Sequence, residues 1–358
     1  MAETSSNGTV EDRFKRVFLI TYPRTASNLF LKMLSLDSQT NVVSNEKGGY
    51  FFWDAFMTGR ISGSTYRPIE NWGLEETDRI REAFQKGLGD LESKSKVAKS
   101  EGKIMFAKEH AQWFVNPAEV DKYLSGHSGP GIMPFEVKFE VPDLIHEMRT
   151  FSSNNLTILP DEYLRTWTPT FLIRHPALAF PSFYRSMLNL EKEGFASAHE
   201  FQPMLKLNST LRWTRLLYDW YSQNTEPSED LKGSAHYPLL LDAQDIINHP
   251  EVMVQYSELI GMDPTKLKFE WNRDAPGKDP GSECEKNHKT PEEVMMETLK
   301  DSSGLLKEKA PVALDISSEA EKWREEFGND LGTQMEGWVR SAIPDFEYLR
   351  ARRLCFDN

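Results

Sequence analysis

The stretch "RVFLITYPRTASNLF", from Arg16 to Phe30, carries the strongest structural signal in the chain. Its first half is a run of apolar and β-branched residues that stops at Pro23, and apolar residues resume at helical spacing from Asn28. The pattern predicts a buried strand, a tight polar turn and a helix. A helix N-terminus has free amide hydrogens and a partial positive charge, so the turn favours a bound anion.

The side chains of the turn suit phosphate or sulfate oxygens. Arg24 supplies a planar fork of N–H donors. Thr25, Ser27 and Asn28 add hydroxyl and amide donors. An ordinary turn in which Thr25 or Ser27 caps the helix would use the same residues, so the turn alone leaves both interpretations open. The Walker pattern GxxxxGK[ST] is absent from the sequence, which argues against a standard ATPase or GTPase.

The composition narrows the class of protein. The chain has 358 residues, of which 39% are hydrophobic, so it can bury a sizeable core. A net charge of −13 argues against a nucleic-acid partner and requires any nucleotide to be held by a few local cations. The sequence has no apolar run near the ~20 residues that span a bilayer, so no membrane partner is expected. Its two cysteines favour a cytoplasmic location. Residues 1–12 are polar and acidic, which predicts a disordered tail and not a secretory signal.

Four segments have the apolar character of buried strands, and helix-like stretches lie between them. The expected strands are Val17–Tyr22, Lys103–Ala107, Thr170–Ile173 and Tyr237–Leu241, and the expected helices include Asn28–Leu36, Ala177–Leu190 and Leu211–Gln223. This alternation predicts an α/β fold with a central parallel sheet flanked by helices on both faces. Ligands bind at the carboxyl ends of the strands in such sheets. The residues expected there are Arg24, Lys108 to His110, Arg174 and Asp242.

Residues 13–358 are expected to form one domain with lid-like insertions. Segments 115–168 and 273–313 are rich in Gly, Pro, Ser and charged residues, which indicates excursions from the sheet. Within the first of them, "PFEVKFEVP", residues 134–142, alternates by twos and predicts a small extra strand. We find no internal repeat and no low-complexity block.

A second strand-to-helix unit points to a family. In "TPTFLIRHPALAFPSFYRSM" a strand is followed by Arg174, and Ser182 lies eight residues further on. Together with "TYPRTASNLF", this resembles the sulfotransferases that use 3′-phosphoadenosine 5′-phosphosulfate (PAPS). In that family a "TYPKSGTTW"-like loop binds the 5′-phosphosulfate, and an arginine and a serine at this spacing hold the 3′-phosphate. The resemblance implies a P-loop NTPase-like sheet and a PAPS-dependent sulfotransferase.

Further motifs occur in the family's order, from about residue 16 to 263. "MFAKEHAQWF" resembles the family's strand ending in Lys-x-His, which places Lys108 and His110 in the site. "ILPDEYL" and the region from "LRWTRLLYDWYSQN" to "YSELIGM" also match in character. The resemblance implies that Trp213 stacks on adenine, although a core tryptophan on a helix face fits the same position. The cofactor-binding residues it implies are Arg24, Thr25, Ala26, Ser27, Asn28, Arg174, Ser182 and Trp213.

The chain also departs from the family pattern. Arg24, Ala26 and Asn28 replace the family's common lysine, glycine and threonine. The family's C-terminal Arg-Lys-Gly phosphate loop is not recognisable after residue 264. Two other interpretations therefore stay open: a nucleotide-binding protein that is non-catalytic, and a phosphotransferase on the same scaffold. The same changes also keep open a sulfation that drives elimination or cyclisation.

Sulfuryl transfer needs in-line positioning and neutralisation of charge on the leaving phosphate. Arg24 would supply that charge, aided by Ser27 and the loop amides, and the resemblance puts Lys108 in the site. No metal is required, and the sequence shows no ligand cluster. A base must take the acceptor's proton, and His110 is preferred because imidazole titrates near neutrality. Glu46, in "SNEKGGYFFW", is its rival, since some carbohydrate-directed relatives place a glutamate at this distance.

The expected acceptor is a hydroxyl of a small molecule, such as a secondary metabolite. The aromatic run "GGYFFWDAF", residues 48–56, would serve either as core or as a wall of an acceptor pocket for an aromatic or terpenoid-like molecule. The sequence is compatible with a homodimer but does not require one.

Overall fold

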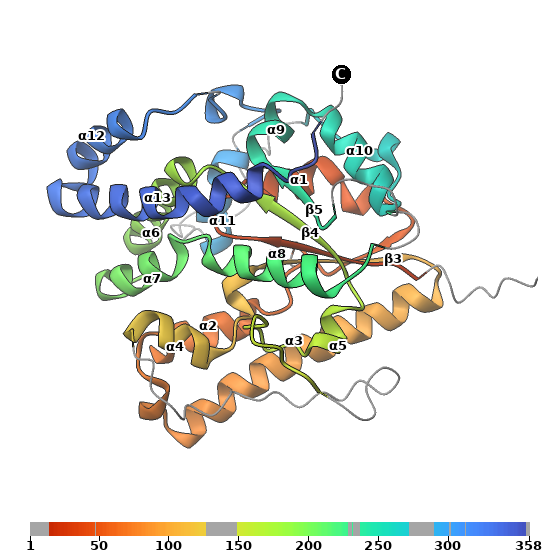
Figure 1. Cartoon of the computed structure of the whole chain (residues 1–358), viewed down its shortest axis with the longest axis horizontal. Helices are drawn as coiled ribbons and strands as arrows, with labels where there is room; N and C mark the ends of the chain where they lie inside the picture. The colour runs from red at the N-terminus through yellow and green to blue at the C-terminus, as the bar shows by residue number, and fades with distance from the viewer. Residues whose placement is uncertain are drawn as a thin grey trace, which may run out of the picture.

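The computed structural model describes residues 14–46, 48–126, 149–227, 231, 237–271, 290–300, 302–311 and 313–355. Its centre is an all-parallel, five-stranded sheet in the order β2-β3-β1-β4-β5 (Figure 1). The strands are β1 (Arg16–Thr21), β2 (Val42–Val43), β3 (Ile104–His110), β4 (Thr168–Ile173) and β5 (Leu239–Asp242). The expected α/β class, with a parallel sheet between helices, is confirmed.

Helices cover both faces of the sheet. They are α1 (Ser27–Leu34), α2 (Trp53–Ile61), α3 (Leu74–Ser100), α4 (Pro117–Ser125), α5 (Asp161–Leu164), α6 (Pro176–Lys192), α7 (Phe201–Asn208), α8 (Arg212–Asn224), α9 (Ala243–Asn248), α10 (Glu251–Ile260), α11 (Pro291–Lys300), α12 (Ile316–Phe327) and α13 (Asn329–Arg350). Val17 and Leu19 pack with α1, α9 and α10 on one face, whereas Phe18 and Ile20 pack with α2, α3, α8 and α13 on the other (Figure 1). Side chains alternate along a strand, so burial on both faces explains the unbroken apolar run in β1.

The central strand aligns the ends of its neighbours. All six residues of β1 are buried, and the strand pairs with β3 so that Thr21 lies opposite His110. On its other side β1 pairs with β4. The carboxyl ends of β1, β3 and β4 therefore meet at one edge of the sheet.

The β3 boundary differs from the expected one. We expected the strand to end at Ala107, with Lys108 to His110 in the following loop. Instead these three residues are the last of β3, and all are buried. Pairing with β1 extends the strand, because the register runs from Arg16 opposite Met105 to Thr21 opposite His110.

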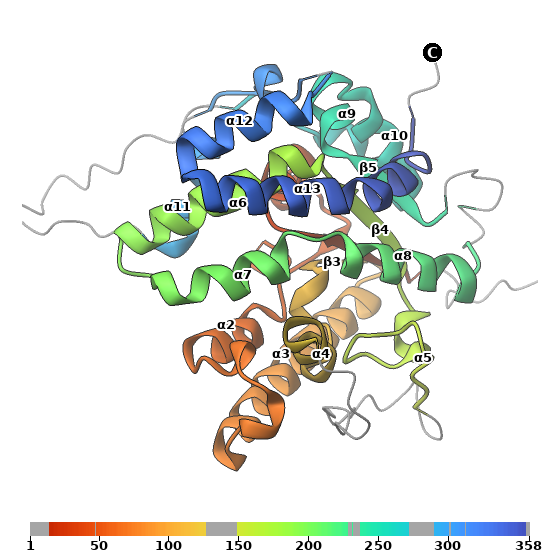
Figure 2. The ribbon, with the colours of Figure 1, turned by 60° about the vertical axis from the view of Figure 1, so that its left-hand side comes forward.

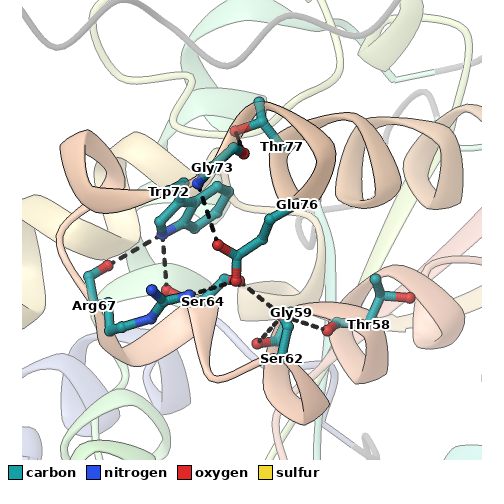
Figure 3. A network of polar contacts seen from close by, with 9 residues as sticks. All are labelled: Thr58, Gly59, Ser62, Ser64, Arg67, Trp72, Gly73, Glu76 and Thr77. Atoms are coloured by element: carbon teal, nitrogen blue, oxygen red, sulfur yellow. Dashed lines mark hydrogen bonds and ion pairs between the residues drawn. The ribbon is translucent and has the colours of Figure 1, made fainter.

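A polar network fixes the start of α3 beside α2 (Figure 3). The Glu76 carboxylate accepts hydrogen bonds from the Ser64 hydroxyl, the Arg67 guanidinium and, at 3.4 Å, the Gly73 N–H. The Trp72 indole donates to the carbonyl oxygens of Ser64, at 3.0 Å, and Arg67, at 3.3 Å. Glu76 is the third residue of the helix, so its contact with the N–H of the N-cap, Gly73, forms one half of a capping box.

Near the C-terminus, α12 and α13 pack against each other, and α13 also contacts α6 and α8 (Figure 2). Within the described ranges no helix has the length and hydropathy to cross a membrane. The expected extra strand at 134–142 and the tail at 1–12 lie outside the described residues. The single-domain organisation stays a prediction.

Candidate active site

The turn after β1 is built from two residues in the left-handed backbone region. Arg24 has φ 67° and Ala26 has φ 62°. The N-cap of α1 is Ala26, whose methyl group cannot accept a hydrogen bond. The Thr25 hydroxyl donates instead to the Tyr22 carbonyl oxygen at 3.0 Å. The interpretation of Thr25 or Ser27 as a helix cap is therefore wrong, and the N-terminus of α1 lacks that side-chain partner.

Arg24, Arg174 and Ser182 meet at the edge where β1 and β4 end. Arg24 Nε donates to Ser182 Oγ at 3.0 Å, and Arg24 Nη1 donates to the Met295 carbonyl oxygen in α11 at 2.8 Å. Arg174 Nη1 donates to the Arg24 carbonyl oxygen at 3.0 Å. The sequence assigned Arg24 and Ser182 to different phosphate groups, but here the two side chains contact each other.

The two guanidinium groups repel each other. Burial, with a smaller effect of the Arg174 charge, lowers the pKa of Arg24 to about 10. Burial also lowers the pKa of Arg174. A shared environment that disfavours two positive charges is one that a bound anion stabilises.

The backbone around these residues is held by Tyr22. Its hydroxyl accepts a hydrogen bond from the Arg174 N–H at 2.9 Å and donates to the Arg174 carbonyl oxygen. This double contact ties the end of β4 to the end of β1. It positions Arg174 relative to the turn.

Lys108 provides a third cation at the same edge. Its side chain is fully buried, donates to Asn28 Oδ1 at 2.9 Å, and places its ammonium 4.0 Å from the centroid of the Tyr50 ring. Burial lowers the pKa of Lys108 to about 7. The chain passes close by at Gly49, which has φ 90° and where an added Cβ would lie 2.9 Å from Lys108 Cβ. Only glycine fits this approach without strain.

His110 lies beside Thr21 and Tyr50. The distances are 2.6 Å from His110 Nδ1 to Thr21 Oγ1 and 3.1 Å from His110 Nε2 to the Tyr50 hydroxyl. Burial, with a smaller effect of Lys108, places the pKa of His110 well below its ordinary value. The expectation that this histidine titrates near neutrality is wrong for the free protein, because the buried imidazole remains neutral there.

Glu109 is a residue that the sequence analysis did not single out. It is fully buried on the opposite side of β3, and its Oε1 accepts hydrogen bonds from the backbone N–H groups of Phe51 and, at 2.9 Å, Phe52. Its Oε2 has no hydrogen-bond partner among the described residues. Burial raises the pKa of Glu109 to about 8. A carboxyl between Lys and His in an otherwise apolar strand was the available signal.

Aromatic side chains surround His110. Trp113 lies edge-on to the imidazole with ring centroids 4.4 Å apart. Tyr50, Trp53 and Phe56 each contact Trp113, with centroids 4.7, 4.8 and 5.1 Å apart. Part of the aromatic run at 48–56 thus lies beside the histidine, while Phe51 and Phe52 are core.

The remaining candidates are Glu46, Trp213 and Asp242, and of these Asp242 acts on the site through its charge, which raises the pKa of Arg174. Glu46 is in an exposed turn. Trp213 is only 4% exposed, and its indole donates to the Leu207 carbonyl oxygen at 3.2 Å. Its stacking on adenine stays a prediction. Asp242 ends β5, caps α9 through the Gln244 N–H at 2.9 Å, and has its pKa raised to about 6 by burial. No set of three His, Cys, Asp or Glu side chains in the described residues could hold a metal ion.

Comparison with known proteins identifies the family. No family model matches the sequence. Two curated proteins named "Sulfotransferase ppzF" are each 40% identical to this chain, one from Metarhizium rileyi over 352 residues and one from Metarhizium majus over 350 residues. In both comparisons the match covers 96% of this chain and 97% of the relative.

Two solved structures were also matched. The sulfotransferase domain of the Synechococcus PCC 7002 olefin synthase is 11% identical, with 92% of this chain and 99% of that chain covered and a TM-score of 0.37. The sulfotransferase domain from the curacin biosynthetic pathway is 12% identical, with coverage of 88% and 98% and a TM-score of 0.36. The assignment rests on the curated relatives: this chain belongs to the sulfotransferase family.

Proposed function

We propose that this sulfotransferase takes its sulfuryl group from PAPS and transfers it to a hydroxyl of a small molecule. The observation that supports this most is the placement of two adjacent buried arginines, Arg24 and Arg174, at the carboxyl edge of the sheet. A donor with two separate phosphate groups suits two adjacent guanidinium groups, because each can form charge-assisted hydrogen bonds.

The residues of this edge fit such a donor. The uncapped N-terminus of α1 and the Ser27 hydroxyl suit the 5′-phosphosulfate. Arg174 and Ser182 suit the 3′-phosphate, with Tyr22 holding the backbone of Arg174 in place. The bound donor would supply an activated sulfuryl group with a phosphate leaving group. Arg24, which now contacts Ser182, would turn toward the leaving phosphate.

The acceptor side is formed by His110 and the aromatic residues around it. The neutral imidazole is in the form that accepts a proton. Trp53, Phe56 and Trp113 offer apolar, aromatic surface beside it, which supports an aromatic or otherwise apolar acceptor, such as a secondary metabolite. Exposed Glu46 fits the role of base less well than His110, since its turn leaves it in solvent.

Nucleotide binding tests the proposal. We expect 3′-phosphoadenosine 5′-phosphate to bind more tightly than adenosine 5′-phosphate in isothermal titration calorimetry. The Arg174→Ala change should weaken binding of the bisphosphate roughly 10- to 100-fold, because a charged hydrogen bond is lost. The affinity for the monophosphate should change much less.

Arg185→Ala is the matched control. Arg185 lies on α6, in the same chain segment as Arg174 and Ser182, but is exposed and pairs with Glu326 at 2.6 Å. Its removal should leave both affinities unchanged, because an exposed ion pair contributes little and lies outside the site. Equal affinity of the unmodified protein for the two nucleotides would contradict the assignment of Arg174 and Ser182.

A further inference from the structure

Tyr50 lies between the turn after β1 and the histidine that ends β3. Its hydroxyl is 3.1 Å from His110 Nε2, and it lies near Ser27, the first residue of α1, whose side chain lowers the pKa of the phenol. Its ring is fixed by the Lys108 ammonium 4.0 Å from its centroid and by Trp113 at 4.7 Å. The phenol is thus contacted both at its ring and at its hydroxyl.

We assign the direction of the hydrogen bonds around His110 from the donors and acceptors that surround the ring. The Thr21 hydroxyl donates its single proton to the Glu109 carbonyl oxygen at 3.1 Å. With that proton directed at Glu109, Thr21 Oγ1 accepts from His110 Nδ1 at 2.6 Å, and this assignment puts the imidazole proton on Nδ1. Nε2 is left with the lone pair, and the Tyr50 hydroxyl donates to it. The basic nitrogen of His110 is consequently occupied by Tyr50. A Thr21 proton directed at Nδ1 would give the opposite tautomer, which the histidine spectra below distinguish.

An acceptor molecule then meets Tyr50 before it meets the imidazole. The imidazole is 7% exposed and edge-on to Trp113, whereas the Tyr50 hydroxyl lies next to Ser27 at the proposed sulfuryl position. On the basis of the proposed function, we propose that Tyr50 is a catalytic residue that relays the acceptor's proton to His110.

The relay is balanced in atoms and charge. One proton moves from the acceptor oxygen to Tyr50 Oη while the Tyr50 proton moves to His110 Nε2, so the tyrosine ends unchanged and the histidine ends as imidazolium. The electron pair left on the acceptor oxygen forms its bond to sulfur. The bond from sulfur to the phosphate oxygen breaks, and its electron pair stays on that oxygen.

The burial of Tyr50 favours a concerted transfer of the two protons. Burial raises the pKa of the Tyr50 phenol, and the Glu109 carboxylate raises it further, while the Ser27 side chain opposes them. Lys108 lies against the ring face. A free tyrosinate is therefore disfavoured, and the phenol acts only while it gains one proton and loses another.

The first test needs no donor. In protein with ¹⁵N-labelled histidine, with the His110 signals assigned by His110→Gln, we expect the Nδ1–H tautomer with Nε2 accepting a hydrogen bond. Tyr50→Phe should move the Nε2 resonance toward that of a free lone pair. Incorporation of 3-fluorotyrosine at position 50, which makes the hydroxyl a stronger donor, should move it the opposite way. The relay is overturned if His110 is the Nε2–H tautomer, or if the Nε2 resonance is the same in both variants as in the unmodified protein.

The second test separates kcat from KM. With PAPS and an aliphatic alcohol, Tyr50→Phe should lower kcat by roughly 10²-fold while the KM for PAPS changes by less than about twofold. With a phenol as acceptor the loss should be much smaller, because a phenol is already acidic. Tyr237→Phe is the matched control: its hydroxyl contacts Thr225 Oγ1 at 3.0 Å before the start of β5, away from the site. It should keep the original kcat.

Two outcomes of the kinetic test contradict the relay. A binding measurement then shows whether the relay or the proposed donor has failed. An unchanged kcat on the alcohol shows that Tyr50 is not in the proton path. Equal losses on alcohol and phenol show that Tyr50 only positions its neighbours. Calorimetry with 3′-phosphoadenosine 5′-phosphate distinguishes a failure of the proposed function: if the unmodified protein does not bind this nucleotide, the donor is wrong, and the histidine spectra still decide the relay geometry.

Discussion

Three consecutive residues at the end of β3 show how burial sets the chemistry of single side chains. Lys108 and His110 point to the side of Tyr50, and Glu109 points to the backbone N–H groups of Phe51 and Phe52. Burial disfavours the charged form of each, so the pKa falls for the lysine and the histidine and rises for the glutamate. None of these three directions follows from the residue types alone.

Glu109 should make stability depend on pH. Its folded-state pKa of about 8 lies above the unfolded value, so the folded protein holds a proton that the unfolded chain releases, and stability falls as the pH rises from about 4.5 to 8. The Glu109→Gln variant does not lose stability in this way, because glutamine does not titrate. Its amide oxygen still accepts the two backbone hydrogen bonds. The Tm of Glu109→Gln minus that of the unmodified protein should therefore be greater at about pH 8 than at about pH 5, by a few degrees.

The control for this measurement is Glu101→Gln. Glu101 is an exposed carboxylate at the end of α3 that pairs with Lys103 at 2.8 Å. Its replacement should give the same small shift in Tm at both pH values. Because the charge of Glu109 raises the pKa of Lys108, the comparison reports on the coupled Lys108–Glu109 pair. A Glu109→Gln shift that does not depend on pH would show that this carboxyl is ionised in the folded protein.

At the scale of elements, the local patterns predicted most of the sheet. The expected strand Val17–Tyr22 corresponds to β1, which begins and ends one residue earlier. It was predictable because its apolar run is buried on both faces. The expected helix Asn28–Leu36 became α1, which ends at Leu34 because Ser35 adopts a left-handed conformation. The two-residue β2 and the long α3 were not predicted. The former is too short for a periodic signal, and the latter is largely polar, so its core contacts come from tertiary structure.

The site was predictable only in part, for a related reason. Arg24, His110 and Arg174 follow from motifs that are local in sequence. The contact of Tyr50 with His110 joins residues 60 positions apart, and that of Arg24 with Ser182 joins residues 158 apart. Such contacts depend on strand order and register, which the sequence pattern does not specify.

The turn before α1 offers a test of backbone strain. Ala26 has φ 62°, a conformation that costs an L-residue about 1–2 kcal/mol, more than the entropy lost by glycine. Ala26→Gly should therefore stabilise the protein by roughly 0.5–1 kcal/mol, a rise in Tm of about 1–3 °C. Ala83→Gly, in the interior of α3, should lower the Tm, because that alanine is helical. The same sign for both changes would show that the turn is not strained. Differential scanning calorimetry gives both values.

At the scale of the whole molecule, the two ends of the sheet have different tasks. The carboxyl edge gathers Arg24, Lys108 and Arg174 in a chain whose net charge is −13, so a local positive site lies within an acidic protein. The opposite edge holds the sheet to α3 and α5. There Arg16, 4% exposed, contacts Glu92, at 2.5 Å, and Tyr163.

This division predicts that stability and binding can be changed separately. Glu92→Ala leaves the buried Arg16 without its carboxylate, and breaking such a pair costs about 3–5 kcal/mol. The urea midpoint should fall markedly, while the affinity for 3′-phosphoadenosine 5′-phosphate, measured where the variant is folded, stays unchanged. Arg174→Ala should do the reverse, since relief of its repulsion with Arg24 spares stability while binding is lost.

Asp78→Ala is the control for the loss of an ion pair on α3. Asp78 is 63% exposed and contacts Arg81 at 2.5 Å, so its removal should cost less than about 1 kcal/mol. Arg16→Met combined with Glu92→Met tests the cause, because apolar side chains in both positions leave no buried charge and should recover much of the stability lost in Glu92→Ala. If Glu92→Ala weakens nucleotide binding as strongly as Arg174→Ala does, the two edges are coupled through β1, and the separation of tasks is wrong.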